Sequence, residues 1–252
     1  IGPYLPEGIR LQLTSPLVSR PYVAITASVM SSFSATGIAI GDHTIGVESS
    51  GYIGTAYDIE SDASSASYPL AAAAIAGGSV KVLGVGDRAL QGDAAFIEVL
   101  ESMGCTTRTT DRSLEVTSSG SLHGIEIDMA DMSDLVPTLA VVAAFADSPT
   151  RITGVGFIRH KESDRIGDLV NGLKMVGCDA VEEDDGILIR PVHESQMHGA
   201  ELLTHDDHRL AMAWSLLALR ISGIVIDDPE VVSKSWPEWW DVRSSLLVVA
   251  AK

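Results

Sequence analysis

One order of secondary-structure elements recurs along the chain, and this internal repetition limits the possible folds more than any other feature. Residues 79–117 predict a strand, a turn bounded by glycines, a helix, a Gly-Cys pair and a second strand. Residues 150–191 predict the same order, residues 11–47 follow a similar plan, and a fourth copy starts at 224–226 without its final strands. Strands are expected at 11–13, 38–40, 45–47, 80–82, 114–116, 151–153, 187–189 and 224–226, and helices at about 25–30, 96–103 and 163–176.

Three further helices lie between the copies and are more apolar than the helices within them. Each follows a polar cluster that can cap its first turn, and they are expected at 63–76, 133–146 and 207–219. Hydrophobicity on all sides is typical of a helix buried between other layers. We therefore predict an α/β fold in which repeated α/β units place buried inner helices beneath outer sheets.

The length and composition set the scale of the molecule. At 252 residues and 46% hydrophobic composition, the chain can bury one large core or two smaller ones. A boundary is expected at 49–60, where Ser49-Ser50-Gly51 interrupts the pattern and separates the first copy from the other three. Because the chain begins at Ile1 with no initiator methionine, we expect a fragment or a processed product.

The charge balance narrows the class of ligand. There are 17 Lys and Arg against 34 Asp and Glu, and a net charge of −17 argues against nucleic acid or an anionic membrane surface as a partner. Small anions remain candidate ligands, provided that the few cations are clustered. No apolar run reaches about 18 residues and no basic-then-apolar leader is present, so a cytoplasmic protein is expected.

The sequence lacks the common motifs for metals, nucleotides and hydrolytic nucleophiles. There is no His-x-x-x-His pair, and Cys105 and Cys178 each follow a glycine at the same point of the repeat. We expect both cysteines to be small buried residues rather than a disulfide or a metal site. The Gly-x-Gly turns do not fit a dinucleotide or P-loop fingerprint, and no serine lies in a Gly-x-Ser-x-Gly elbow. No metal and no cofactor are predicted.

Residues 157–165 gather three basic residues, a histidine and two carboxylates within nine positions. Each copy carries a polar loop just after its first strand, where its helix begins. Helix N-termini present free N–H groups and a positive dipole end, so such loops would favour phosphate or carboxylate groups if they line one face. The loops are Ser19-Arg20-Pro21-Tyr22, Gln91-Gly92-Asp93, Lys161-Glu162-Ser163-Asp164-Arg165 and Ser233-Lys234-Ser235.

A structural interpretation also remains open for each of these segments. Residues 157–165 fit the charged first turn of an amphipathic helix, and Asp134 fits a first-turn carboxylate. His208 and Arg209 fit the start of a core helix, although an arginine there opposes the helix dipole, which favours a functional role. Lys234 fits an ordinary loop lysine. Packing roles are expected for Trp236, Trp239 and Trp240.

Six runs together resemble one family, 3-phosphoshikimate 1-carboxyvinyltransferase, also called 5-enolpyruvylshikimate-3-phosphate synthase. They occur in family order across nearly the whole chain, which makes them far more specific than any one run. The runs are Leu17-Val18-Ser19-Arg20-Pro21-Tyr22, Asp62-Ala63-Ser64-Ser65-Ala66-Ser67-Tyr68, Gln91-Gly92-Asp93, Lys161-Glu162-Ser163-Asp164-Arg165, Asp207-His208-Arg209-Leu210-Ala211-Met212 and Lys234-Ser235-Trp236-Pro237.

The resemblance implies the inside-out barrel of the enolpyruvyl transferases, with two globular domains that are each built from three α/β units and close over the substrates. Family members are longer, so this chain resembles their C-terminal part. Residues 1–58 are expected to be the C-terminal remnant of the first domain, and residues 59–252 the second domain, incomplete at its N-terminus. Exposed apolar surface is expected in the first fifty residues, where neighbours would be missing.

The activity that the resemblance implies is transfer of the enolpyruvyl group of phosphoenolpyruvate to the 5-hydroxyl of shikimate 3-phosphate, which releases phosphate in aromatic amino acid biosynthesis. Position by position, Asp134 and Lys161 match the groups that hold and deprotonate the hydroxyl, and Glu162 the group that moves the methylene proton. His208 is also expected to act in catalysis. The matches to substrate binding are Ser19, Tyr22, Asp134 and Lys161 for shikimate 3-phosphate, and Arg165, His208, Arg209 and Lys234 for phosphoenolpyruvate.

Departures from the family leave two alternatives open. Phe157 stands where many members have a polar residue, and the family's N-terminal phosphate-binding residues have no counterpart, so the chain alone is expected to be inactive. It could instead be a non-catalytic fragment that binds an anion or a partner, including the missing N-terminal half. Enolpyruvyl transfer to UDP-N-acetylglucosamine is disfavoured, because that family uses a reactive loop cysteine and neither Cys105 nor Cys178 lies in a polar loop.

Overall fold

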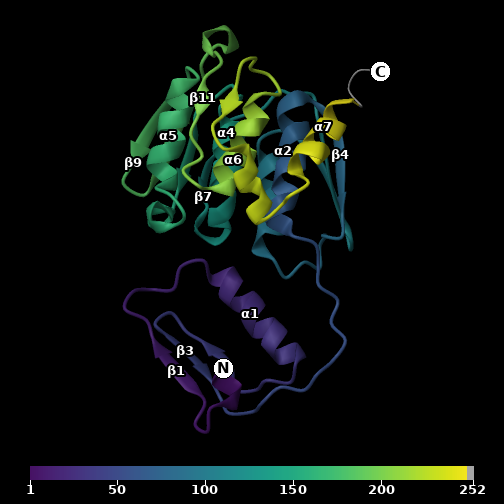
Figure 1. Cartoon of the computed structure of the whole chain (residues 1–252), viewed down its shortest axis with the longest axis vertical. Coiled ribbons are helices and arrows are strands. Elements are labelled where there is room, and N and C mark those ends of the chain that lie inside the picture. Colours follow the sequence, from purple (N-terminus) through teal and green to yellow (C-terminus); the bar gives the residue numbers. More distant parts are fainter. Residues whose placement is uncertain (249–252) are drawn as a thin grey trace.

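The computed structural model describes residues 1–248 and shows a small body and a large body joined by an extended segment (Figure 1). The small body, residues 1–57, pairs its strands in the order β1-β3-β2, all antiparallel, and places α1 beside this sheet. Its elements are the 3-10 turn Gly2–Tyr4, β1 (Ile9–Gln12), α1 (Arg20–Ser32), β2 (Ala39–Ile40) and β3 (Thr44–Val47).

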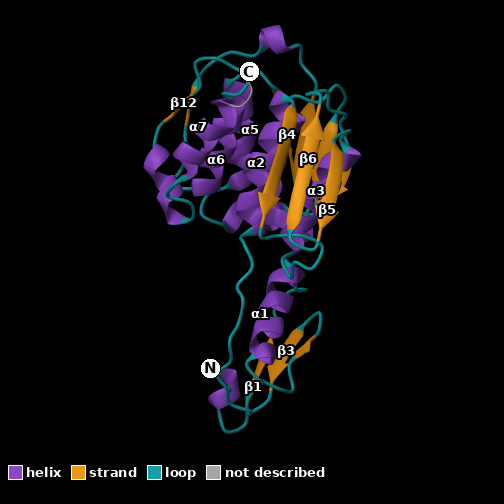
Figure 2. Cartoon of the chain, turned by 90° about the vertical axis from the view of Figure 1, so that its right-hand side faces the viewer, coloured by secondary structure: helices purple, strands orange, loops and turns teal. Residues whose placement is uncertain are grey.

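The large body, residues 62–248, contains three sheets in the orders β4-β6-β5, β7-β8-β10-β9 and β11-β12. Figure 2 shows the first of them along one side of the body, and α2 and α3 pack against it. The helices are α2 (Ala63–Ala76), α3 (Phe96–Ser102), α4 (Val136–Ala143), α5 (Arg165–Met175), α6 (His208–Leu217) and α7 (Trp239–Val248). The strands are β4 (Gly78–Leu83), β5 (Thr106–Thr110), β6 (Ser113–Ser118), β7 (Glu126–Asp128), β8 (Thr150–Thr153), β9 (Asp179–Glu183), β10 (Gly186–Arg190), β11 (Glu201–Leu202) and β12 (Val225–Ile226).

Helices α2, α4 and α6 form the centre of the large body, and each of the three contacts the other two. All eight residues of α4 are buried, as are nearly all residues of α2 and α6. Aspartates cap two of these helices, because Asp62 accepts from the N–H of Ser64 and Asp207 from the N–H of Arg209, both at 2.9 Å. The predicted α/β fold with buried inner helices and outer sheets is confirmed.

Four strands, β5, β7, β9 and β11, were not among the predicted elements. The strands β5 and β9 lie at sheet edges and carry mostly polar side chains, so they lack the apolar alternation on which the prediction relied. The helix predicted at 133–146 was also wrong at its start, because a 3-10 turn at Ala130–Leu135 precedes α4. Pro137 then lies in the first turn of α4, where its missing N–H has no consequence.

Burial differs sharply between the two bodies. In residues 1–57 the buried residues are Gly2, Pro3 and Ala35, and α1 buries none of its own. Leu11 is 46% exposed and Val18 is 49% exposed, in agreement with the apolar surface expected there. Within residues 1–248, no helix is long and apolar enough to cross a membrane.

The cysteines and tryptophans occupy the positions expected of core residues. Cys105 and Cys178 are free and buried. Trp239 is fully buried and donates from its indole N–H to Ser215 at 3.1 Å, while Trp236 and Trp240 pack against the core from its edge. The structural roles predicted for these residues are confirmed.

The ring of Trp214, from α6, lies against α5 so closely that position 172 requires a glycine. A Cβ atom there would lie 2.5 Å from the ring of Trp214, which is itself 1% exposed. Alanine has the higher helix propensity, but the forced contact outweighs that gain. We expect Gly172→Ala to lower the free energy of unfolding by about 1–3 kcal/mol in urea titrations. Asn171→Ala, at the exposed neighbouring position, is the control and should not destabilise the chain.

Candidate active site

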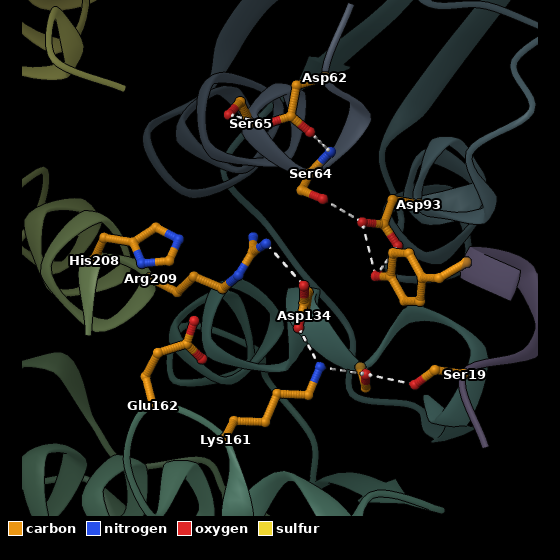
Figure 3. Close-up of polar contacts among 12 residues, drawn as sticks. Ser19, Asp62, Ser64, Ser65, Asp93, Asp134, Lys161, Glu162, His208 and Arg209 are labelled. Atoms are coloured by element: carbon orange, nitrogen blue, oxygen red, sulfur yellow. Dashed lines mark hydrogen bonds and ion pairs between the residues drawn. The ribbon is translucent and has the colours of Figure 1, made fainter. Parts of the chain in front are cut away.

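Two of the four polar loops predicted from the repeats, 161–165 and 233–235, meet the starts of α4 and α6 in one region of the large body. Asp134 lies in the 3-10 turn Ala130–Leu135 before α4, Lys161 and Glu162 precede α5, and Lys234 ends the 3-10 turn Pro229–Lys234. His208 and Arg209 are the first two residues of α6. The structure thus brings together side chains from three units that lie up to about a hundred positions apart in sequence. Figure 3 shows most of these side chains directed toward a common space.

Asp134 lies at the centre of the group and binds three cations. Its Oδ1 accepts from Lys161 Nζ at 2.6 Å and from Arg165 Nη1 at 3.0 Å, and its Oδ2 accepts from Arg209 Nη2 at 2.8 Å. In Figure 3 its carboxylate lies between Lys161 and Arg209. Burial alone would raise the pKa of Asp134, but Arg209, Lys161 and Arg165 outweigh it and lower the pKa to about 2. The carboxylate is therefore ionised at neutral pH.

Glu162 forms a second junction of charges beside the first. Its Oε1 accepts from Lys234 Nζ at 2.8 Å and its Oε2 from Arg165 Nη2 at 2.8 Å. Burial opposes ionisation, yet Lys234 and Arg165 lower the pKa of Glu162 to about 2. Because Lys234 is 51% exposed at its side chain, this ion pair is open to a ligand that competes for the ammonium group.

Arg165 is the most buried cation of the cluster, with a side chain that is only 1% exposed. Its Nε donates to Asp207 Oδ2 at 2.7 Å, and its other two nitrogens reach the carboxylates of Asp134 and Glu162. Asp207 is fully buried and also caps α6, so this ion pair joins the beginnings of α5 and α6. The predicted contact of Arg165 with a ligand stays a prediction, because its nitrogens are taken by carboxylates here.

His208 brings a buried and unsatisfied nitrogen to the same region. The residue is 4% exposed, and its Nδ1 has no hydrogen-bond partner within the described part of the chain. Burial, followed by the charge of Arg209, lowers the pKa of His208, so the imidazole is neutral at neutral pH. A buried nitrogen without a partner is costly, and it is therefore a candidate ligand contact.

The small body contributes Ser19 and Tyr22 at the first turn of α1. Ser19 Oγ lies 3.4 Å from Ser133 Oγ, and Tyr22 donates to Asp93. Ser133 in turn lies 3.5 Å from Lys161 Nζ, which connects the small body to the cation cluster. Phe157, whose role the sequence left without an explanation, is half-buried and packs against the core.

Three polar residues of the region were not predicted as site residues. The sequence placed Asp207 in a capping cluster and Asp93 in a polar loop, each within a run that resembles the family, and Ser133 at the beginning of a helix, without a role for any of the three. Their burial is the feature that distinguishes them, because Asp207 and Ser133 are fully buried and Asp93 is 2% exposed. Burial of polar groups cannot be read from residue type, so the two runs that hold Asp93 and Asp207 were the one signal in the sequence, and Ser133 had none.

The arrangement can bind an anion and move a proton. Four cations, from Lys161, Arg165, Arg209 and Lys234, surround three carboxylates, from Asp134, Glu162 and Asp207. In this cluster the cations outnumber the carboxylates by one, four against three, although the net charge of the chain is −17. Ionised carboxylates beside a lysine can act as bases, and arginines suit bidentate contacts to carboxylate or phosphate.

Comparison with known proteins identifies the family. The model of the family described as "EPSP synthase (3-phosphoshikimate 1-carboxyvinyltransferase)" matches residues 1–242. The chain belongs to the EPSP synthase family. A 3-phosphoshikimate 1-carboxyvinyltransferase of Methanoculleus marisnigri is 42% identical over 241 residues, which cover 95% of this chain and 56% of that protein. A relative of the same name from Nostoc punctiforme is 40% identical, with 95% and 56% of the two chains covered.

Solved structures support the same assignment. The EPSP synthase of Acinetobacter baumannii superimposes with a TM-score of 0.77 at 28% identity, covering 97% of this chain and 58% of that one. The enolpyruvyl transferase NikO from Streptomyces tendae shares the fold, with a TM-score of 0.74 at 19% identity and coverage of 97% and 56%. The chain thus spans somewhat more than half the length of the EPSP synthases that it matches.

The buried pair between Arg165 and Asp207 predicts a large and specific effect on stability. Asp207→Ala leaves a buried guanidinium without its principal partner and should lower the free energy of unfolding by about 3–5 kcal/mol, measured by urea titration. Asp164→Ala is the matched control, since Asp164 caps α5 and pairs with Arg159 but is 48% exposed. Its loss should cost about 1 kcal/mol. Equal effects of the two changes would contradict the central role of Asp207.

The ionised state of Asp134 predicts a dependence of stability on pH. Its folded pKa of about 2 lies below the ordinary value of 3.8 for an aspartate, so its contribution is present above pH 4 and is lost as the pH falls toward 2. This contribution is on the order of 2 kcal/mol. Asp134→Asn should be less stable than the parent chain at pH 7, and the difference should shrink at pH 2. Unfolding free energies from urea titrations at both pH values measure it, and a constant difference would contradict the prediction.

Proposed function

We propose that this chain supplies much of the active site of an enzyme that transfers the enolpyruvyl group of phosphoenolpyruvate to the 5-hydroxyl of shikimate 3-phosphate, with release of phosphate. The observation that carries the proposal is the convergence of proton-transfer groups and cations at the helix entrances of three units. The participating residues are Asp134, Lys161, Glu162, His208, Arg209 and Lys234. Membership of the EPSP synthase family supports it.

Asp134 and Lys161 are the candidates for activating the 5-hydroxyl. Asp134 is ionised, and substrates that draw Arg209 and Lys161 away would raise its pKa, so that it can accept the hydroxyl proton as the oxygen attacks the C2 carbon of phosphoenolpyruvate. Lys161 lies 2.6 Å from the same carboxylate and can stabilise the attacking oxygen. The result of the attack is a tetrahedral intermediate, which collapses when phosphate leaves.

Glu162 is the candidate for moving the proton at the methylene carbon, which gains a proton on addition and loses one as phosphate departs. Lys234 and Arg165 hold Glu162 ionised in the absence of a ligand. An arriving anion competes for Lys234 and adds negative charge, and both changes raise the pKa of Glu162. Binding of an anion would therefore raise the pKa of Glu162 toward the range in which it can take up and release the methylene proton.

Arg209, His208 and Lys234 are the candidates for holding the carboxylate and phosphate of phosphoenolpyruvate. Arg209 uses one nitrogen on Asp134, and its guanidinium offers further donors for a bidentate contact. His208 has an unsatisfied Nδ1 beside it. Arg165 would join them if an incoming anion displaced Glu162 from its Nη2. Ser19 and Tyr22, with Asp134 and Lys161, are proposed to contact shikimate 3-phosphate.

We further propose that residues 1–58 are the remnant of a first domain and residues 59–252 the bulk of a second. The nearly coreless small body and the coverage of 56–58% of the relatives' length support this division. The proposed partner of the chain is the N-terminal half of such an enzyme, which would complete the binding of both small anionic substrates. A cytoplasmic location stays a prediction.

Release of phosphate from shikimate 3-phosphate and phosphoenolpyruvate tests the function. The 252-residue chain alone should release none above background, whereas a polypeptide that also carries an N-terminal half of the family should turn over. In that longer polypeptide Lys161→Ala and Glu162→Gln should each lower kcat by a factor of about 100 or more. Lys174→Ala, in the last turn of α5, is the control and should retain kcat.

Two outcomes would overturn the proposal. Turnover with UDP-N-acetylglucosamine in place of shikimate 3-phosphate would assign another acceptor, although burial of Cys105 and Cys178 favours the shikimate reaction. Binding of phosphoenolpyruvate by the longer polypeptide without any phosphate release would instead indicate a non-catalytic anion-binding protein.

A further inference from the structure

Asp93 is a buried carboxylate that has no part in the chemistry proposed above. It lies in the 3-10 turn Gly92–Ala95 and is 2% exposed. No Lys, Arg or His lies within ion-pair distance of it among residues 1–248, and hydroxyl groups bind it instead. Tyr22 donates to its Oδ1 at 2.9 Å, and Ser64 donates to its Oδ2, as Figure 3 shows for Ser64 and Asp93. A carboxylate buried without a cation is costly, so its position requires an explanation.

The bond from Tyr22 crosses between the two bodies. Tyr22 belongs to α1 of the small body, and Asp93 belongs to the large body. The side-chain hydrogen bonds that join residues 1–57 to residues 62–248 are this one and the longer contact of 3.4 Å between Ser19 and Ser133. Of these two bonds, the one from Tyr22 to Asp93 is the shorter, and its acceptor is a carboxylate.

The backbone around Asp93 is shaped for close approach of the small body. A Cβ atom added at Gly92 would lie 2.9 Å from Cβ of Pro21, so the first turn of α1 rests directly on the Gly92–Ala95 turn. Ser64 extends the connection to the first turn of the inner helix α2. Asp93 thus joins an element of the small body to two elements of the large body.

The same contact determines what Tyr22 can offer to a ligand. Burial and the neighbouring charge of Asp93 raise the pKa of the Tyr22 phenol, so it stays protonated and its proton is directed to Asp93. A ligand beside Tyr22 meets the ring and a free lone pair of the oxygen, but no available O–H donor.

We propose that Asp93 is a positioning residue that holds the small body against the large body through Tyr22. It thereby sets the distance between the Ser19 and Tyr22 side of the candidate active site and the cation cluster. The simpler alternative is that Asp93 only stabilises the helix that follows it, as an acidic residue in a first turn. That alternative predicts no energetic coupling between Asp93 and Tyr22.

The distance between spin labels on the two bodies tests the proposal. Labels at Ser32→Cys in α1 and Glu98→Cys in α3 occupy exposed positions, and both native cysteines are buried. Asp93→Asn and Tyr22→Phe should each broaden the distance distribution and reduce the ratio of joined to separated molecules about tenfold, as expected for loss of one hydrogen bond to a charged group. The double variant should change the ratio no further than either single variant.

The control removes a neighbouring carboxylate, Asp62, whose hydrogen bonds to Ser64 and Ser65 stay within the first turn of α2. Asp62→Ala takes the cap from the same first turn of α2 and should lower the melting temperature while leaving the distance distribution unchanged. Additive effects of Asp93→Asn and Tyr22→Phe, or distributions identical to that of the parent, would overturn the proposal.

A second variant keeps the test decisive if Asp93→Asn does not fold. Gly92→Ala retains the carboxylate but forces Pro21 away, so it should also shift the distribution toward separated molecules. An unchanged distribution in this variant would overturn the proposal. Because neither measurement requires turnover, the result is independent of the enzymatic function proposed above.

Discussion

The buried contact between Arg165 and Asp207 is the interaction on which the rest of the site depends. It joins the first turns of α5 and α6, and these two turns carry or adjoin Lys161, Glu162, His208 and Arg209. A buried ion pair is a costly way to join two helices, because hydrophobic contacts would be at least as stable. Its advantage is a fixed geometry, because the planar guanidinium of Arg165 can hold three carboxylates at defined angles.

The repeated unit explains how so many charges reach one place in an acidic chain. Each copy turns from a strand into a helix through a polar loop, and in the large body the loop before α5 and the turn that ends at Lys234 meet beside the first turn of α6. Four of the chain's 17 Lys and Arg residues, Lys161, Arg165, Arg209 and Lys234, meet in this one cluster. Electrostatic attraction for small anions is thus local, while the net charge of −17 disfavours polyanions.

Within the cluster, the carboxylates of Asp134 and Glu162 are paired with the four cations. Asp134 and Glu162 occupy the cations in the structure, and both are strongly ionised because of them. A phosphate or carboxylate that binds here replaces internal partners and changes the proton affinity of the carboxylates it displaces. The junction at Asp93 and Tyr22 adds a geometric condition, since it determines how closely the small body approaches this cluster.

The sequence by itself determined the repeats, the three inner helices and the polar loops, because these follow from periodicity and residue type, while the chemical roles proposed for single residues follow from the resemblance of six runs to the family. It could not identify β5 and β9, whose polar edge strands lack a hydrophobic period. Only the tertiary structure decided which polar residues are buried and paired. Arg165 is enclosed by three carboxylates, Asp207 is a buried partner rather than a simple cap, and Asp93 meets Tyr22 from 71 positions away. Burial and long-range pairing arise when distant segments pack together, so a local pattern of residues cannot predict them.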